Sequence, residues 1–258
     1  MVALQNKVVV ITGASSGFGK IIAQKCVQSG ASVVLAARSE EPLAHVAATL
    51  QGNRILAIPT DVTQDKDVAH LVRRTLERFG SVDVLVNSAG FGVIDSVVNA
   101  SLSDFNEMLD VNLCGVTRCT QAFLPHMLAQ RSGHIIMMAS LAGLIATNNM
   151  GFYSASKFAL IGMSRALMLE LHGTGVLCTV VCPGIALTGF QRRAPLERYA
   201  RSTQLVPWTT AERVADVTLR AVERKIQGEI VIPHVGRVFA VACTLFPGLA
   251  RRVMSIIG

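Results

Sequence analysis

The chain has 258 residues, of which 51% are hydrophobic and only 16% are charged, a composition that supports a large buried core and argues against disorder. The formal net charge is +7, and most of the excess lies in residues 190–258, with eleven Lys or Arg against five Asp or Glu. The first residues lack the features of a signal peptide, and no stretch reaches the ~18 apolar residues that cross a bilayer. Aromatic residues make up only 5% of the sequence, which is few for stacking on the bases of a nucleic acid. We therefore expect a cytoplasmic globular protein that binds no nucleic acid.

Apolar, β-branched runs alternate along the chain with segments of helical periodicity. The expected strands are 7–12, 32–37, 54–58, 82–87, 134–139, 176–182 and 229–232. The expected helices are 17–29, 40–50, 64–79, 104–124, 152–171 and 211–225. Continuous apolar strands separated by helices indicate a parallel sheet that is covered on both faces. Right-handed crossovers then give a doubly wound, Rossmann-type α/β fold of about seven strands in three layers, so we expect residues 1–258 to form one domain.

The ends of the longest expected helices carry local signals. Ser103 or Asp104 is expected to cap the helix 104–124, and Pro125 is expected to end or bend it.

A glycine-rich loop, T-G-A-S-S-G-F-G at 12–19, directly follows the first strand and opens the first helix. Gly13 allows a tight turn, Gly17 permits close backbone approach to a pyrophosphate, and Gly19 lets the helix pack on the sheet. The helix N-terminus adds amide donors and the positive end of a dipole. The loop thus predicts a phosphate site, and the residues expected to hold the coenzyme are Gly13, Ser15, Ser16, Gly17, Phe18 and Gly19.

The second strand ends in L-A-A-R-S-E, where a carboxylate would hold a ribose 2′-hydroxyl. Arg38 occupies this place instead, and a guanidinium suits a 2′-phosphate. We therefore expect NADP(H) as the preferred coenzyme, with Ser15 and Ser16 as additional donors, and NAD(H) as the alternative. The competing interpretation is that Arg38 is an ordinary surface charge.

No metal site is expected. The six cysteines form no C-x-x-C pair, and the histidines show no ligand spacing, so the cysteines are interpreted as buried free thiols.

Together, these and later motifs make the sequence resemble the short-chain dehydrogenase/reductase family over about residues 5–235. The segments that carry the resemblance appear in the family's order: T-G-A-S-S-G-F-G at 12–19, D-V at 61–62, N-S-A-G at 87–90, Asn112 within D-V-N-L, Ser140, Y-S-A-S-K at 153–157 and P-G-I-A-L-T at 183–188. Ser88 departs from the usual N-N-A-G, at a position that is generally structural.

The resemblance implies roles for individual residues around the coenzyme. Asp61 and Val62 should contact the adenine. The ribose side should be lined by Asn87, Ala89 and Gly90, and the nicotinamide carboxamide should be bracketed by Pro183, Gly184, Ile185 and Thr188.

Tyr153 and Lys157 lie four residues apart and so share one face of a helix. A free phenol has a pKa of about 10, and a nearby ammonium stabilises the phenolate. Tyr153 is therefore expected to act as general acid or base near neutral pH, with Lys157 also donating to the nicotinamide ribose. By the resemblance, Ser140 binds the substrate oxygen, and Asn112 anchors a water that links Lys157 to solvent.

The predicted reaction is hydride transfer between NADP(H) and a carbonyl or secondary alcohol. Residues 187–207 lie where the family usually carries its substrate lid, and their four arginines suggest an anionic substrate group or a solvated helix face. The expected pocket wall is mainly apolar, which favours a hydrophobic ketone or aldehyde: Leu141, Ala142, Ile145, Asn148, Met150 and Phe190. There are two alternatives. The first is an NAD-linked alcohol or hydroxysteroid-type dehydrogenase, and the second is a non-catalytic, membrane-associated protein that binds a nucleotide.

The tail 237–258 is apolar with three arginines, too short and interrupted to span a membrane. It could lie at a lipid surface with Arg237, Arg251 and Arg252 toward the headgroups, cover the substrate pocket, or pack on a partner subunit. The resemblance implies a homodimer or homotetramer built through the helices 104–124 and 152–171.

Overall fold

The computed structural model describes residues 4–50, 54–186, 208–248 and 252. The expected substrate lid, with Thr188 and Phe190, lies outside the described residues, as does most of the tail beyond 248.

A seven-stranded sheet of entirely parallel strands forms the centre of the protein, in the order β3-β2-β1-β4-β5-β6-β7. Its strands are β1 (Val8–Thr12), β2 (Ser32–Ala37), β3 (Ile55–Pro59), β4 (Val84–Asn87), β5 (Gly133–Met138), β6 (Val176–Pro183) and β7 (Gly228–Ile232). The strand order reverses between β1 and β4, and ligands of doubly wound sheets bind at such a reversal, beyond the carboxyl ends of the strands.

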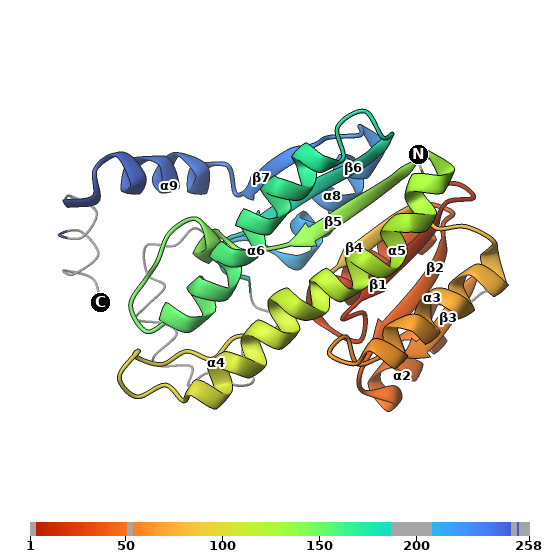
Figure 1. Ribbon diagram of the computed structural model, residues 1–258, viewed down its shortest axis with the longest axis horizontal. Helices are drawn as coiled ribbons and strands as arrows, with labels where there is room; N and C mark the ends of the chain where they lie inside the picture. Colours follow the sequence, from red (N-terminus) through yellow and green to blue (C-terminus); the bar gives the residue numbers. More distant parts are fainter. Residues whose placement is uncertain (1–3, 51–53, 187–207, 249–251, 253–258) are drawn as a thin grey trace.

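Helices cover both faces of the sheet (Figure 1). They are α1 (Gly17–Gln28), α2 (Glu40–Leu50), α3 (Asp65–Phe79), α4 (Leu102–Leu109), α5 (Val116–Gln130), α6 (Gly151–Glu170), α8 (Ala211–Glu223) and α9 (Val235–Leu245), with a π-helix η1 (Asp110–Gly115) and a short 3₁₀ helix η2 (Leu141–Gly143). Figure 1 shows α5 and α6 in front of the sheet and α8 behind it.

Alternation along the buried strands divides the interior into two cores. In β2, Val33 and Leu35 pack on the face that α1 and α8 cover, whereas Val34 and Ala36 pack on the face that α3, α5 and α6 cover. Successive strand residues point to opposite faces, so an uninterrupted apolar run fills both cores. The predicted three-layer fold is confirmed.

The structure differs most from the prediction in the region of the expected helix 104–124. It is a continuous rod of three segments, α4, η1 and α5. Ser101 caps it rather than Ser103 or Asp104, because the Ser101 hydroxyl accepts a hydrogen bond from the Ser103 backbone amide. Pro125 does not end the helix, which continues to Gln130.

The described tail forms a further helix, α9, which follows β7 and was not expected as a separate element. Within the described ranges, no helix combines the length and the hydropathy that a membrane span requires.

Candidate active site

The loops after β1 and β4 are joined at the point where the strand order reverses. The Thr12 hydroxyl accepts hydrogen bonds of 3.1 Å from the backbone amides of Ser88 and Ala89. Gly13 has a positive φ of 67°, and a Cβ there would lie 2.8 Å from the Cα of Ala89. The predicted tight turn at Gly13 is therefore present, and the close approach of the second loop also requires glycine.

The first turn of α1 forms a cradle of backbone donors beside this junction. A Cβ at Gly19 would lie 2.4 Å from the carbonyl oxygen of Gly13, so only glycine lets the helix start against the loop. Ser16 is the N-cap residue, yet its side chain makes no capping hydrogen bond among the described residues. The first-turn amides are thus left for an anion, which is the donor set that a pyrophosphate uses.

A cleft of about 330 Å³ opens in front of this cradle. It runs along the carboxyl ends of β1, β2, β3 and β4, and its lining includes Gly13, Ser15, Ser16, Gly17, Phe18, Arg38, Asp61, Val62, Ala89 and Gly90. The structure thus brings together most of the residues that were predicted to hold the coenzyme, and their donors fit a dinucleotide.

Arg38 stands exposed at the rim of this cleft, near Ser15, Ser16 and Ser39, which line the same space. No ion pair to Arg38 exists within the described chain. An unpaired guanidinium beside three hydroxyls is a suitable receptor for a phosphate.

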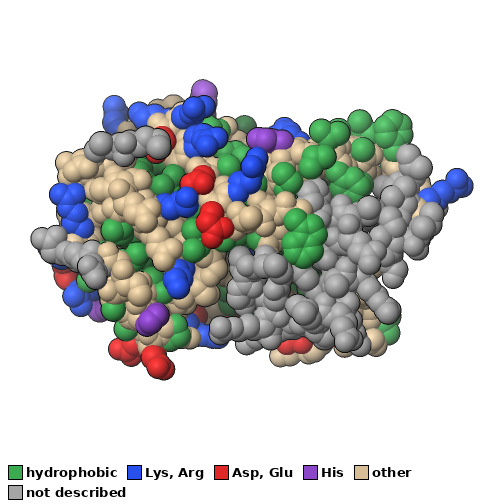
Figure 2. Space-filling model, turned by 180° about the vertical axis from the view of Figure 1, so that it is seen from behind, with side chains coloured by type: hydrophobic (Ala, Val, Ile, Leu, Met, Phe, Trp, Pro, Cys, Tyr) green, Lys and Arg blue, Asp and Glu red, His purple; other side chains and the backbone are tan. Residues whose placement is uncertain are grey.

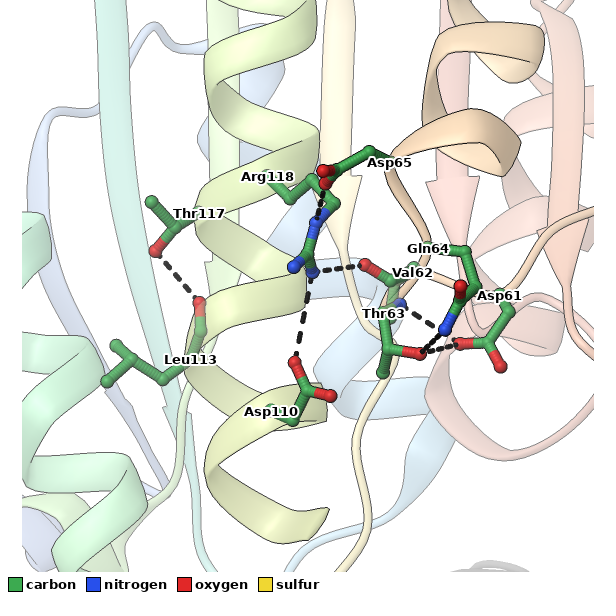
Figure 3. A network of polar contacts seen from close by, with 9 residues as sticks. All are labelled: Asp61, Val62, Thr63, Gln64, Asp65, Asp110, Leu113, Thr117 and Arg118. Carbon is green, nitrogen blue, oxygen red and sulfur yellow. Dashed lines mark hydrogen bonds and ion pairs between the residues drawn. The ribbon is translucent and has the colours of Figure 1, made fainter. Parts of the chain in front are cut away.

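The loop after β3, which carries Asp61 and Val62, is held by a network of polar contacts (Figure 3). The Asp61 carboxylate accepts hydrogen bonds from the Thr63 amide and hydroxyl. From α5, the Arg118 guanidinium donates to the Val62 carbonyl at 2.8 Å and pairs with Asp65. It also lies 3.9 Å from the Asp110 carboxylate in η1.

A second, smaller cavity of about 100 Å³ adjoins the cleft. Phe18, Ser88 and Gly90 line both spaces. The rest of its wall includes Ser140, Leu141, Ala142, Ile145, Thr147, Met150, Tyr153, Lys157, Pro183, Gly184 and Ile185. The predicted catalytic serine, tyrosine and lysine therefore face one cavity at the end of the nucleotide cleft.

Ser140 follows β5 and caps η2, where its hydroxyl oxygen accepts a hydrogen bond of 3.1 Å from the Ala142 amide. Because the hydroxyl serves as acceptor in this contact, its proton remains available to donate to an oxygen in the cavity.

Tyr153 and Lys157 lie one turn apart on α6, and both are buried. The Lys157 ammonium donates to the Met138 carbonyl at 3.0 Å and lies 5.9 Å from the centre of the Tyr153 ring. Burial away from water lowers the pKa of Lys157 from 10.5 to about 8. The lysine thus remains mainly charged at neutral pH, beside the phenol.

Asn112 lies in η1, the π-helical turn of the rod, and is fully buried. Its side chain accepts from the Phe91 amide at 3.0 Å, donates to the Phe91 carbonyl at 2.9 Å and donates to the Ser156 hydroxyl at 3.1 Å. A Cβ at Gly90 would lie 3.0 Å from the Asn112 amide oxygen and 3.6 Å from the Lys157 ammonium. Asn112 therefore fixes the loop after β4 beside Lys157, and π-helical turns are frequent at functional sites.

Asn87 and Asn148 lie elsewhere than the sequence suggested, and Gly19 lines neither space because it packs against the loop. Asn87 lines neither space, because its amide nitrogen points into the core and donates to the Thr120 hydroxyl at 3.0 Å. Asn148 is exposed and does not line the cavity, whereas its neighbour Thr147 does.

Thr147 is a polar residue of the cavity wall that sequence reasoning missed. Its hydroxyl is buried without a hydrogen-bond partner among the described residues, and the residue shares the wall with Ser140 and Tyr153. Its position in an irregular loop carries no periodic signal that could have revealed it.

No group of three or more potential metal ligands occurs in the part of the chain that the structure describes. The expectation of buried free thiols is confirmed for four cysteines, Cys26, Cys119, Cys178 and Cys182, and is wrong for Cys114, which is exposed, and for Cys243, which is half-buried. Burial raises the pKa of each of the four buried thiols from 9.0 to about 12.

Comparison with known proteins gives one consistent family. A family model described as short chain dehydrogenase matches residues 7–198. An uncharacterized oxidoreductase of Staphylococcus saprophyticus is 43% identical over 191 residues, which cover 73% of this chain and 82% of that protein. A solved short chain dehydrogenase/reductase from Burkholderia phymatum, in complex with NAD, is 30% identical, with a TM-score of 0.87 and 97% of both chains covered. A short-chain dehydrogenase from Streptomyces avermitilis is 26% identical, with a TM-score of 0.83 and coverage of 95% of this chain and 97% of that chain.

Proposed function

The chain belongs to the short-chain dehydrogenase family of NAD(P)-dependent oxidoreductases, and from this premise we propose that it reduces an apolar ketone or aldehyde with NADPH. One observation carries the proposal: Ser140, Tyr153 and Lys157 line a single cavity that continues into the cleft of the glycine-rich loop. The reverse reaction, oxidation of a secondary alcohol, uses the same groups.

Each side chain has one task in this proposal. A bound NADPH supplies the hydride for the carbonyl carbon. The Ser140 hydroxyl donates a hydrogen bond to the carbonyl oxygen, where negative charge develops. Tyr153 donates the proton that completes the alcohol, and the Lys157 ammonium stabilises the phenolate that this transfer leaves behind.

The substrate class follows from the cavity wall. Leu141, Ile145, Met150 and Ile185 are among the residues that line it, and apolar walls select an apolar body around the reacting carbonyl.

The coenzyme preference rests on Arg38. Its exposed guanidinium beside Ser15 and Ser16 favours the 2′-phosphate of NADP(H). An NAD-linked dehydrogenase is the second candidate, and the NAD complex of the Burkholderia phymatum protein favours it. We also propose a homodimer or homotetramer, as implied by the family resemblance.

Replacement of Tyr153 by Phe tests the catalytic assignment. The Tyr153→Phe variant should bind NADPH with unchanged affinity but lose at least about 100-fold in turnover, since general acid–base groups contribute about that much. Fluorescence titration measures the binding, and NADPH oxidation with a panel of hydrophobic ketones measures the turnover. Equal turnover by the variant and the wild type would refute the assignment.

Replacement of Arg38 by Asp tests the coenzyme assignment. The Arg38→Asp variant should lose about tenfold or more in kcat/KM for NADPH and gain in relative preference for NADH, because a carboxylate repels the phosphate and binds a ribose hydroxyl. Arg74→Asp, the same charge change on the exposed surface of α3, serves as control. If the wild-type enzyme had the same kcat/KM for NADH as for NADPH, this assignment would be wrong.

A further inference from the structure

The helix α9 is seated on the protein by one of its faces. Gly236 and Ala240 on this face are buried, and Ala240 belongs to the same hydrophobic core as Leu141. The other face is exposed, as at Val238, and Figure 2 shows hydrophobic side chains gathered over this helix, at the upper right of the molecule. Leu141 directly follows Ser140, so the seated face of α9 packs on the segment that carries the proposed hydrogen-bond donor.

The contact with this segment is closest at Gly236. A Cβ there would lie 3.2 Å from a methyl carbon of Leu141 and 3.1 Å from a methyl carbon of Val231 in β7. Both neighbours are almost fully buried. Because protein interiors are close-packed, any side chain larger than glycine at this position has to displace one of its neighbours.

The start of α9 is tied to β7, which leaves the helix little room to move away. Gly236 lies in the first turn of α9, and in the same turn the Arg237 guanidinium donates to the Glu229 carbonyl of β7 at 3.2 Å. Val231 is fixed in turn by the pairing of β7 with β6. Leu141 is therefore the neighbour that yields when the space at Gly236 is filled.

Leu141 begins the 3₁₀ helix η2, which contacts α6 as well as α9. A Cβ at Gly143 would lie 2.7 Å from the Lys157 carbonyl oxygen, so η2 and α6 are in close contact. Ser140 is bound to η2 through two hydrogen bonds: its hydroxyl accepts from the Ala142 amide at 3.1 Å, and its carbonyl accepts from the Gly143 amide at 2.9 Å. A shift of η2 thus moves Ser140 relative to α6, the helix that carries the proposed proton donor.

We propose that Gly236 is a positioning residue: it lets α9 approach Leu141 and thereby keeps the Ser140 hydroxyl where it reaches the substrate carbonyl. This inference rests on the proposed function, in which Ser140 donates to that oxygen. Misplacement of a catalytic group by about 1 Å can lower the rate about 100-fold, so a contact behind the cavity is sufficient to control turnover. The helix α9 thus supports the active site although none of its residues lines the cavity.

The variant Gly236→Val tests this proposal, with NADPH and the most rapidly reduced ketone of the hydrophobic panel. It should bind NADPH with wild-type affinity and lose at least about tenfold in kcat. Gly248→Val makes the same change at an exposed glycine whose Cβ would meet nothing within 4 Å, so this control should keep the wild-type kcat. If Gly236→Val does not fold, Gly236→Ala takes its place, because it adds only the Cβ and favours the helix; its loss in kcat should be smaller.

Two further backgrounds show whether the effect passes through Leu141 and Ser140. In Leu141→Ala, which lacks the methyl groups that the new side chain meets, Gly236→Val should change kcat by less than about twofold. In Ser140→Ala, which should itself lose at least about 100-fold, Gly236→Val should again change kcat by less than about twofold. General damage to the fold would instead lower kcat by the same factor in every background.

The proposal is overturned if Gly236→Val keeps the wild-type kcat, or if its loss is as large in either background as in the wild type. Failure of the proposed reaction has a different signature. The wild-type protein would then reduce no member of the panel, or Ser140→Ala would turn over as fast as the wild type, and the positioning role of Gly236 would fall with it.

Discussion

At the scale of single residues, Lys157 and His134 are two bases that the fold keeps away from water. Burial lowers the pKa of both, to about 8 for Lys157 and to about 4 for His134. Lys157 thus stays mainly charged at pH 7, as its proposed role requires, whereas His134 is neutral there. The His134 ring shares a hydrogen bond of 2.7 Å with the Thr179 hydroxyl, which donates in turn to the Ile226 carbonyl.

The lowered pKa of His134 predicts a loss of stability in mild acid. A histidine in the unfolded chain takes up its proton near pH 6.5, whereas the folded protein resists protonation down to about pH 4. The stabilising contribution is therefore fully present above pH 6.5 and is lost as the pH falls toward 4, by about 3 kcal/mol at most. Urea unfolding at a series of pH values between these limits measures it.

A matched pair of variants assigns this pH dependence. His134→Gln keeps a side chain that can bond Thr179 but does not titrate, so its unfolding free energy should fall less over this range. His172→Gln, at an exposed histidine, should follow the wild type. An unchanged pH dependence in His134→Gln would show that another group is responsible.

At the scale of elements, the rod of α4, η1 and α5 connects the two halves of the site. Asp110 and Asn112 both lie in η1, and Arg118 follows in the first turn of α5. A Cβ at Gly115 would lie 2.7 Å from a methyl carbon of Val62, so the rod and the loop after β3 are in direct contact. The sequence predicted one helix here, because apolar periodicity does not distinguish a single π-helical turn from α-helix.

The Arg118 contacts predict a specific effect on coenzyme binding. Arg118→Met removes the hydrogen bond to the Val62 carbonyl, which positions the loop that is proposed to hold the adenine. The ion pair with Asp65 should contribute little, because Asp65 is 90% exposed. We expect the Kd for NADPH to rise roughly tenfold, equivalent to about 1.4 kcal/mol, as measured by fluorescence titration.

Reduced nicotinamide mononucleotide, which lacks the adenosine, provides the comparison. Its affinity should be the same in Arg118→Met and the wild type, and Arg73→Met, at an exposed arginine of α3, should bind NADPH normally. Equal losses for both nucleotides would indicate general damage to the fold and count against a positioning role for Arg118.

At the scale of the whole molecule, the sequence predicts the fold closely because its strands are buried on both faces. Continuous apolar, β-branched runs such as 32–37 are typical of strands at the centre of a parallel sheet, and β2 occupies the same residues. Gly13, Ser140 and the loop after β6 each follow the carboxyl end of a strand, so they lie on the same side of the sheet. For this reason, the motifs at the strand ends predicted most of the site.

The remaining features depend on side-chain directions and tertiary packing that no sequence period encodes. The amide of Asn87 turns into the core toward Thr120, and Thr147 lines the cavity from an irregular loop. The helix α9 is apolar on both sides, so its composition alone did not separate the seated face from the exposed one.

The central claim is that a hydride and a proton reach the same carbonyl group in the cavity of Ser140, Tyr153 and Lys157. Deuterium transfer tests it most directly: the enzyme is supplied with NADPH deuterated at the nicotinamide C4 and a panel of hydrophobic ketones and aldehydes, and the alcohols are analysed by mass spectrometry. We predict an alcohol that carries one deuterium at the carbinol carbon and is not formed by Tyr153→Phe. Tight NADPH binding without deuterium in any product, or equal labelling by Tyr153→Phe, would contradict the account.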